Sequence, residues 1–205
     1  MNAQHLSALV SARLCHDLIS PIGAIGNGLE LLQLSGGAGS AEIDLISDSL
    51  GTAMSKIRFF RIAFGPADPE GRLMVDEMRE VTSGIYNNRI TVTWDIAERD
   101  IPRSCGQMLF LTLLCLEKGL PMGGQIVVTG GSESYAFSIN ARKVAPPAEF
   151  WNHVLDGVEL DGLKSDGVQF ALLRGELERS GSNLDVNFGE TEATARLDCK
   201  VPQTV

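Results

Sequence analysis

The chain has 205 residues, enough for one large domain or for two small domains with separate cores. Hydrophobic residues make up 44% of it and charged residues 21%, the composition of an ordinary soluble globular protein. The net charge of -9 disfavours a nucleic-acid partner, because nucleic-acid-binding surfaces are basic. No charged segment followed by an apolar stretch opens the sequence, and apolar runs such as 108–116 are too short to span a bilayer. We therefore expect a cytoplasmic protein without a membrane partner.

The first 65 residues carry apolar side chains at the three- and four-residue spacing of amphipathic helices. The segment 35–40 is rich in Gly and Ser and predicts a turn, Ser40 can cap the second helix, and Gly65-Pro66 ends that helix. The result is an antiparallel helical hairpin. Two helices bury little surface, and a second copy would complete a four-helix bundle, so we predict a homodimer.

The remainder has a different pattern. Helical periodicity covers residues 75–86, 104–120, 148–155 and 166–180, and strand periodicity covers residues 89–96, 124–129, 135–141, 184–188 and 193–201. A mixed sheet with helices on one face accounts for this order. We predict an α+β fold with a hairpin domain at 1–66, a linker around Asp68-Pro69-Glu70-Gly71, and a second domain at 72–205.

His16 is the most informative residue of the first helix. On a helical wheel it falls about 170° from the centre of the apolar stripe, so its ring is expected to face solvent. Ile19 also lies off the stripe and is a candidate exposed apolar contact. The other residues on the histidine face are small: Ala12, Ser20, Gly23, Ala24 and Asn27. A small, partly apolar surface around an imidazole suits the docking of another protein.

Glycine and proline are unusual inside a helix. Glycine costs about 1 kcal/mol relative to alanine there, so Gly23, Gly26 and Gly28 favour a close approach by another surface. Pro21 removes a backbone donor and clashes with the carbonyl group of Asp17, which predicts a bend just after His16.

These residues suit phosphoryl transfer. A neutral imidazole nitrogen is a good nucleophile, and Asp17 can accept the proton of the other ring nitrogen or stabilise the developing imidazolium. Folding the hairpin brings the second helix around Phe59 level with His16. Arg58 or Arg61, with Lys56 nearby, is then a candidate to face a phosphoryl group or an acidic partner, and helical phase leaves open which one does so.

Metal and redox chemistry within the chain are not expected. The cysteines at 15, 105, 115 and 199 show no C-x-x-C spacing, and no His lies at ligand spacing from a pair of them, so we expect reduced thiols that mostly fill the core, and no metal site. Phosphoryl transfer needs magnesium, and the chain offers no convincing acidic cluster for it. We therefore expect the partner to bring Mg²⁺ and this chain to bind no cofactor.

The run His16-Asp17-Leu18-Ile19-Ser20-Pro21 resembles the H-box of sensor histidine kinases, and the second domain resembles their GHKL-type ATP-binding domain in element order. The ATP-binding residues of that domain are missing. Apolar residues at 111–116 and Glu117 replace the N-box asparagines and basic residue, and 140–144 lack the D-x-G-x-G motif. The glycine-rich lid is reduced to Ser165-Asp166-Gly167.

Together with the run from Arg13 to Ile25, this combination resembles the ChpT family of bacterial histidine phosphotransferases over nearly the whole chain. The resemblance implies a homodimer that carries phosphoryl groups from the receiver of a hybrid histidine kinase to response regulators, including a cell-cycle transcription regulator. It implies that His16 is the phosphoacceptor with Asp17 and Ser20 around it, and that Arg13 belongs to the partner-binding surface. The second domain would help to dock the receiver.

Two alternatives remain. A lone exposed histidine on a helix is usually an ordinary surface residue, so the chain could be a non-enzymatic dimeric adaptor that binds receivers. It could also be a divergent ATP-dependent histidine kinase. Full activity of His16→Ala would support the adaptor, and ATP binding would support the kinase.

Overall fold

The computed structural model describes residues 3–34, 40–66, 68, 70–86 and 89–200. The predicted turn at 35–39, the predicted cap by the Ser40 side chain, Pro69 of the linker and the last residue of the final predicted strand, at 201, lie outside this description.

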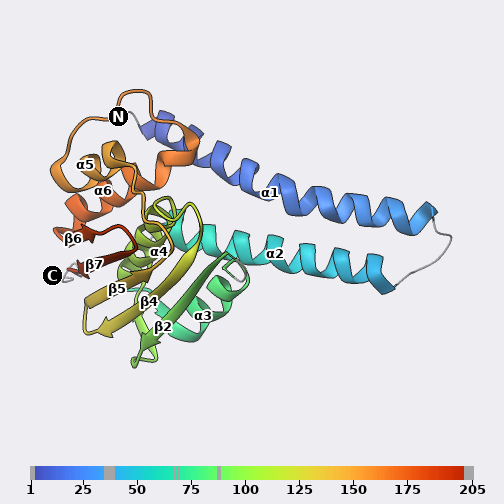
Figure 1. The fold of residues 1–205 in the computed structure, drawn as a ribbon, viewed down its shortest axis with the longest axis horizontal. Helices are drawn as coiled ribbons and strands as arrows, with labels where there is room; N and C mark the ends of the chain where they lie inside the picture. The colour runs from blue at the N-terminus through green and yellow to red at the C-terminus, as the bar shows by residue number, and fades with distance from the viewer. Residues whose placement is uncertain (1–2, 35–39, 67, 69, 87–88, 201–205) are drawn as a thin grey trace.

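The N-terminal part is the predicted hairpin, built from helix α1, Ala3–Leu34, and helix α2, Ser40–Phe64, which lie side by side (Figure 1). α1 continues through Pro21. Gly28 is buried, and a Cβ atom there would lie 2.6 Å from Cγ1 of Ile46, so this glycine serves the contact between α1 and α2 and not a docking surface. Gly23 and Gly26 have open space around them, as the docking interpretation requires.

α1 is apolar over a longer stretch than the search for continuous apolar runs indicated. By length and composition alone, Gln4–Leu34 meets the criterion for a membrane span, which core helices of soluble proteins also meet. This helix carries Arg13, His16 and Asp17, and it packs along α2. Its apolar side chains are nonetheless left largely open, with Ile22 57% and Leu29 49% exposed. The hairpin therefore has an apolar surface that the single chain does not cover.

The second part contains a five-stranded mixed sheet in the order β2-β4-β5-β7-β6. β2 and β4 are parallel, and the other neighbours are antiparallel. The strands are β2, Ile90–Ile96; β4, Gly124–Gly131; β5, Ser134–Asn140; β6, Asn183–Phe188; and β7, Glu192–Asp198. Buried and exposed residues alternate along these strands, so one face of the sheet is covered.

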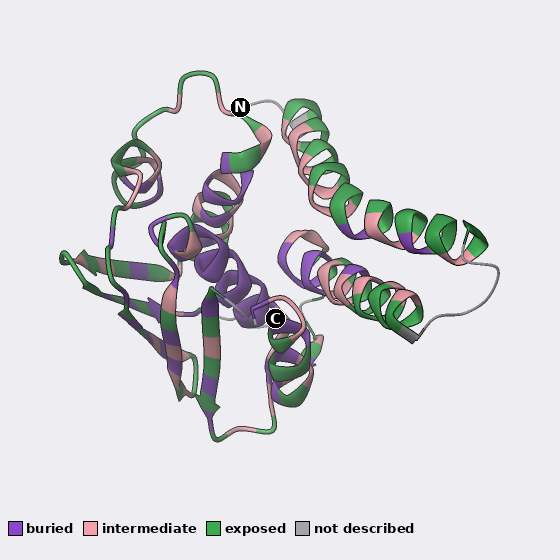
Figure 2. Ribbon diagram, turned by 45° about the vertical axis from the view of Figure 1, so that its right-hand side comes forward, coloured by how far each residue is buried: buried purple, intermediate pink, exposed green. Residues whose placement is uncertain are grey.

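Helices cover that face, as predicted (Figure 2). They are α3, Val75–Ser83; α4, Arg103–Glu117; α5, Ala148–Asp156; and α6, Val168–Ser180, which the 3-10 turn η1, Ser165–Gly167, precedes. Every residue of α4 from Ser104 to Leu116 is buried. The predicted α+β architecture is confirmed, and its core lies between α4 and the sheet.

Two strands were not predicted. β1, Arg72–Met74, and β3, Asp100–Pro102, form a separate antiparallel pair. Three residues are too few to show a two-residue alternation, and each strand runs directly into a helix. The predicted helix at 75–86 is also shorter than expected, because it ends at Ser83 with Gly84 as its cap.

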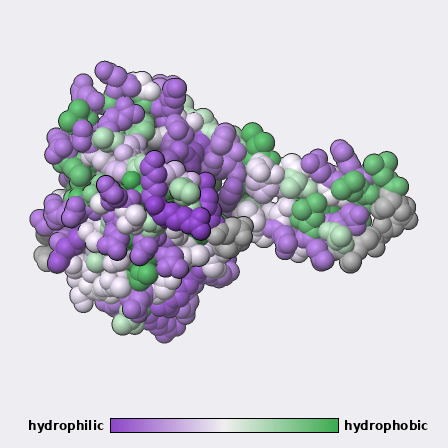
Figure 3. Space-filling view, in the orientation of Figure 1, coloured by the Kyte–Doolittle hydropathy of each residue, from purple (hydrophilic) through white to green (hydrophobic). Residues whose placement is uncertain are grey.

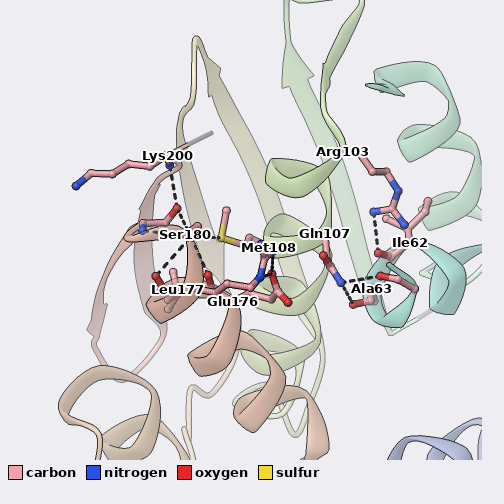
Figure 4. A network of polar contacts seen from close by, with 12 residues as sticks. Ile62, Ala63, Arg103, Gln107, Met108, Glu176, Leu177, Ser180 and Lys200 are labelled. Atoms are coloured by element: carbon pink, nitrogen blue, oxygen red, sulfur yellow. Dashed lines mark hydrogen bonds and ion pairs between the residues drawn. The ribbon is translucent and has the colours of Figure 1, made fainter. Parts of the chain in front are cut away.

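The base of the hairpin is fixed to the second part by polar contacts as well as apolar ones (Figure 4). Arg103 of α4 donates to the carbonyl of Ile62 at 3.0 Å, and Gln107 donates to the carbonyls of Ala63 at 3.3 Å and Gly65 at 2.9 Å. These carbonyls lie at the C-terminal end of α2, where a helix has no acceptor partners of its own. α4 therefore caps α2 at the base of the hairpin.

Candidate active site

The imidazole of His16 faces solvent, as predicted, with 84% of its side chain exposed. Its Nδ1 lies 2.9 Å from Oδ1 of Asp17. A carboxylate only accepts hydrogen bonds, so in the neutral imidazole Nδ1–H donates and Nε2 keeps the free lone pair. The sequence neighbour thus fixes the tautomer that makes Nε2 a nucleophile.

Asp17 is held on its other side by Arg13. Oδ2 of Asp17 lies 2.6 Å from Nε of Arg13, and the two side chains are only 17% and 14% exposed. Arg13 also donates to the carbonyl of Asp166 in η1 at 3.3 Å. Arg13 was predicted at the partner-binding surface. The structure instead places its guanidinium between the carboxylate beside His16 and the second part of the chain.

Lys56 contacts the same residue from α2. Its Nζ donates to the backbone carbonyl of Asp17 at 2.8 Å. In an uninterrupted helix this carbonyl would accept from the backbone N–H of residue 21, which Pro21 lacks. Sequence reasoning named Lys56 only as a neighbour. Pro21 could have indicated such a contact, because a proline inside a helix leaves one backbone carbonyl without its usual donor.

A cavity of about 180 Å³ lies against Asp17, between the hairpin and the second part. Its lining includes Arg13, Lys56, Tyr86 and Glu117. The hydroxyl of Tyr86 donates to Oε2 of Glu117 at 2.8 Å. Burial, reinforced by the charge of Glu117, raises the pKa of Tyr86 well above its ordinary value, so the phenol stays a donor.

Arg58 and Arg61 are engaged by α3. Arg58 contacts Glu80 at 2.6 Å, and Arg61 contacts Glu77 at 3.2 Å. The hydrogen bond from Arg58 is the main reason that the pKa of Glu80 is lowered. The structure does not bring either guanidinium to the His16–Asp17 pair, although Arg61 keeps 70% of its side chain exposed.

The predicted docking residues around His16 are accessible. Ile19 is 68% exposed, and Ser20, Gly23 and Asn27 are exposed as well. Cys15 is also exposed, whereas Cys105, Cys115 and Cys199 are buried free thiols, so the cysteines mostly fill the core as predicted. The projecting hairpin carries hydrophobic and hydrophilic patches side by side in Figure 3. In the described part of the chain, no cluster of three or more His, Cys, Asp or Glu residues is placed to hold a metal ion.

Comparison with known proteins identifies the chain. Residues 75–192 match the histidine phosphotransferase C-terminal domain. The chain belongs to the histidine phosphotransferase family. It is 35% identical over 156 residues to the protein phosphotransferase ChpT of Brucella abortus (strain 2308), with 73% of this chain and 74% of that protein covered.

The fold agrees with this family. A solved 1.7 Å structure of a bacterial phosphotransferase is 28% identical, has a TM-score of 0.80, and covers 96% of this chain and 97% of that one. The resemblance to the ChpT family and the two-part fold are confirmed. The chain is a phosphorelay phosphotransferase, and such a protein has receiver domains as partners.

Proposed function

We propose that His16 is the phosphoacceptor of this phosphotransferase and that Nε2 is the attacking atom. The observation that carries the proposal is the exposed imidazole whose Nδ1 is held at 2.9 Å by Asp17. A receiver aspartate could approach such a ring from solvent. The free lone pair on Nε2 is oriented without any rearrangement of the helix.

The transfer then proceeds as a displacement at phosphorus. Nε2 forms a bond to the phosphoryl group while the bond from phosphorus to the receiver's aspartyl oxygen breaks and the carboxylate leaves. Nδ1 keeps its proton, so the phosphorylated ring carries a positive charge. Asp17 stabilises that charge, and the reverse displacement passes the phosphoryl group to a second receiver.

The surface around His16 suits docking. Ile19 supplies an apolar contact, and Ser20, Gly23 and Asn27 leave room for a receiver to approach. Arg61 can meet the acidic pocket of a receiver directly, and Arg58 after it releases Glu80. Arg13 contributes to this surface indirectly, because it holds the carboxylate of Asp17 next to His16. We assign the required Mg²⁺ to the receiver.

The wider setting follows from the same reasoning. The exposed apolar side chains of the hairpin support a homodimeric four-helix bundle formed by residues 1–66, with residues 72–205 as a second domain that helps to hold the receiver. The partners would be the receiver of a hybrid histidine kinase and response regulators that act in the bacterial cell cycle. The proposed location is the cytoplasm.

We further propose that the second domain does not use ATP. Leu111, Thr112 and Cys115, where the kinases carry N-box residues, are fully buried in α4. Glu117 is occupied by Tyr86. Side chains that are fully buried do not reach a magnesium-bound phosphate, and Leu111 has no polar atom to offer it. Isothermal titration should therefore show no ATP binding, and labelled ATP should not label His16.

The test is phosphotransfer from a labelled, phosphorylated receiver in the absence of ATP. Wild-type protein should take up the label, and His16→Ala should not. His5→Ala is the matched control, because His5 is another exposed histidine of α1 and should leave labelling unchanged. Labelling of His16→Ala at the wild-type level would contradict the proposal, and full biological activity of that variant would favour the adaptor.

A further inference from the structure

We infer that Lys56 is a positioning residue for the phosphoacceptor, because its ammonium replaces the backbone donor that Pro21 removes and thereby holds Asp17 against His16. This inference rests on the proposed role of His16. In this inference Lys56 binds the backbone carbonyl of Asp17 and does not contact the phosphoryl group.

The backbone geometry creates the need for this donor. The carbonyl of residue 17 would accept from the N–H of residue 21 in an α-helix, and Pro21 has no N–H. Pro21 is buried, and Nζ of Lys56 lies 2.8 Å from the carbonyl oxygen of Asp17 in a partly buried contact. An ammonium donor forms a stronger hydrogen bond than a neutral amide, so Lys56 supplies this carbonyl with a donor in place of the missing backbone N–H.

Asp17 is then held at two points. Lys56 fixes its carbonyl from α2, and Arg13 fixes its carboxylate from the preceding turn of α1. The remaining carboxylate oxygen is aimed at Nδ1 of His16. Neither the main chain nor the carboxylate of Asp17 can rotate away from the imidazole without breaking a charged contact. The imidazole is therefore oriented before a receiver arrives, which is what transfer between positioned groups requires.

The location of Lys56 argues against a direct contact with phosphate. Its ammonium faces the backbone of α1 beside the cavity that Arg13, Asp17, Tyr86 and Glu117 line, between the hairpin and the second part. The ring of His16 is 84% exposed. Lys56 acts on the ring through Asp17, and its removal should change the orientation of the ring more than the affinity for the receiver.

The first experiment compares Lys56→Met with Lys56→Arg in single-turnover transfer from a labelled phospho-receiver. Lys56→Met should lower the transfer rate by at least about tenfold with little change in receiver affinity, and Lys56→Arg should keep most of the rate. Lys200→Met is the control for loss of a lysine charge, because Lys200 is exposed and lies beside Ser182, away from α2 (Figure 4). A wild-type rate for Lys56→Met would overturn the inference.

The second experiment restores the missing backbone donor. Pro21→Ala supplies an N–H for the carbonyl of Asp17, so Lys56 should become dispensable. The loss caused by Lys56→Met should shrink to less than about twofold in the Pro21→Ala background, because the two substitutions act on one carbonyl. Equal fractional losses in both backgrounds would show that Lys56 acts elsewhere. If Lys56→Met alone fails to fold, recovery of folding and transfer in the double variant supports the inference, and failure to recover refutes it.

A spectroscopic signature separates positioning from general stability. Nitrogen-15 spectra of the imidazole should show His16 with its proton on Nδ1 in the wild type and a mixture of tautomers in Lys56→Met. An unchanged tautomer in Lys56→Met would count against the inference, and this readout remains usable if Pro21→Ala itself slows transfer. Persistent labelling of His16→Ala would refute the proposed function instead, so the two failures are distinguishable.

Discussion

The hairpin exposes much of its apolar surface, whereas the second part of the molecule buries nearly all of its own. Among the described residues, ten of the thirteen exposed large hydrophobic side chains belong to α1 and α2. Of the described α1 residues, Leu14 packs against the hydrophobic core and none is fully part of it, whereas α4 is buried from Ser104 to Leu116. Figure 2 shows this contrast as an exposed hairpin beside a buried centre. The second part packs its core against the end of α2, through residues such as Phe59 and Ile62, whereas much of the apolar surface of the hairpin stays open in the single chain.

This difference divides the work of the protein. A nucleotide site needs polar residues that reach a ligand, and the interior of the second part is instead filled by side chains such as Phe110 and Leu111. A receiver and the proposed second copy need open surface, and the hairpin supplies it in side chains such as His16, Ile19 and Ile22. The second part therefore serves as a well-packed base from which an accessible helix pair projects.

Phe110→Ala is expected to have the largest effect, because it tests how tightly the core of the second part is packed. Phe110 is fully buried, with its ring 4.7 Å from that of Phe59 and 5.8 Å from that of Trp94. Loss of such a ring should lower the free energy of unfolding by about 3–5 kcal/mol. Denaturant unfolding measures this change. Val158→Ala, at a half-exposed position, should change it by less than about 0.5 kcal/mol. Similar losses for both variants would remove the contrast between core and surface.

The pKa values of the two tyrosines test whether water reaches the core of the second part. Burial raises the pKa of both Tyr86 and Tyr135 above the ordinary value, so the folded protein keeps both phenols protonated where the unfolded chain ionises them. This contribution to stability is complete below about pH 10 and is lost as the pH rises above it, by about 1.4 kcal/mol per pH unit for each tyrosine. Phenolate absorbance should appear only as the protein unfolds.

A double variant isolates this effect from the titration of lysines. Tyr86→Phe with Tyr135→Phe should flatten the fall in stability between pH 10 and pH 11 by about 2 kcal/mol, because the full slope is reached only above the ordinary pKa of about 10. Titration of either tyrosine near pH 10 in the folded protein would mean that water reaches the core.

The open hairpin is tested by charges at Leu50 and Met54, which are each 51% exposed and lie one turn apart on α2. The double substitution to Glu should weaken the proposed dimer by about a hundredfold, because it buries two charges in an apolar seam. Sedimentation velocity over a range of concentrations measures this change. Met122→Glu, at a 55% exposed position outside the hairpin, should leave the assembly unchanged. A wild-type protein that stays monomeric at high micromolar concentration would contradict the dimer.

The two regions also differ in what the sequence could predict. Periodicity and apolar runs located every long helix and every strand of the main sheet, because most of these elements bury one face and α4 is apolar almost throughout. β1 and β3 were missed because three residues show no period. The outward direction of His16 followed from helical phase alone. The partners of Arg13 did not, since the contact with Asp166 joins residues that are 153 positions apart. The hydrogen bond from Lys56 to the carbonyl of Asp17 depends on how α1 and α2 are aligned, which the sequence does not give. Pro21 indicates only that the carbonyl of Asp17 has no backbone donor.

The smallest expected effect lies at the junction of the two regions. Gln107→Ala removes the donor that caps the carbonyls of Ala63 and Gly65 at the end of α2. The cost should be about 1 kcal/mol in unfolding free energy, since each bond contributes little and water can replace part of the cap. Gln125→Ala, on an exposed strand position, is the matched control. If the cap also sets the direction of the hairpin, Gln107→Ala should slow transfer to His16 more than its stability loss implies. A transfer rate that stays at the wild-type level would mean that apolar packing around Phe59 alone orients the hairpin.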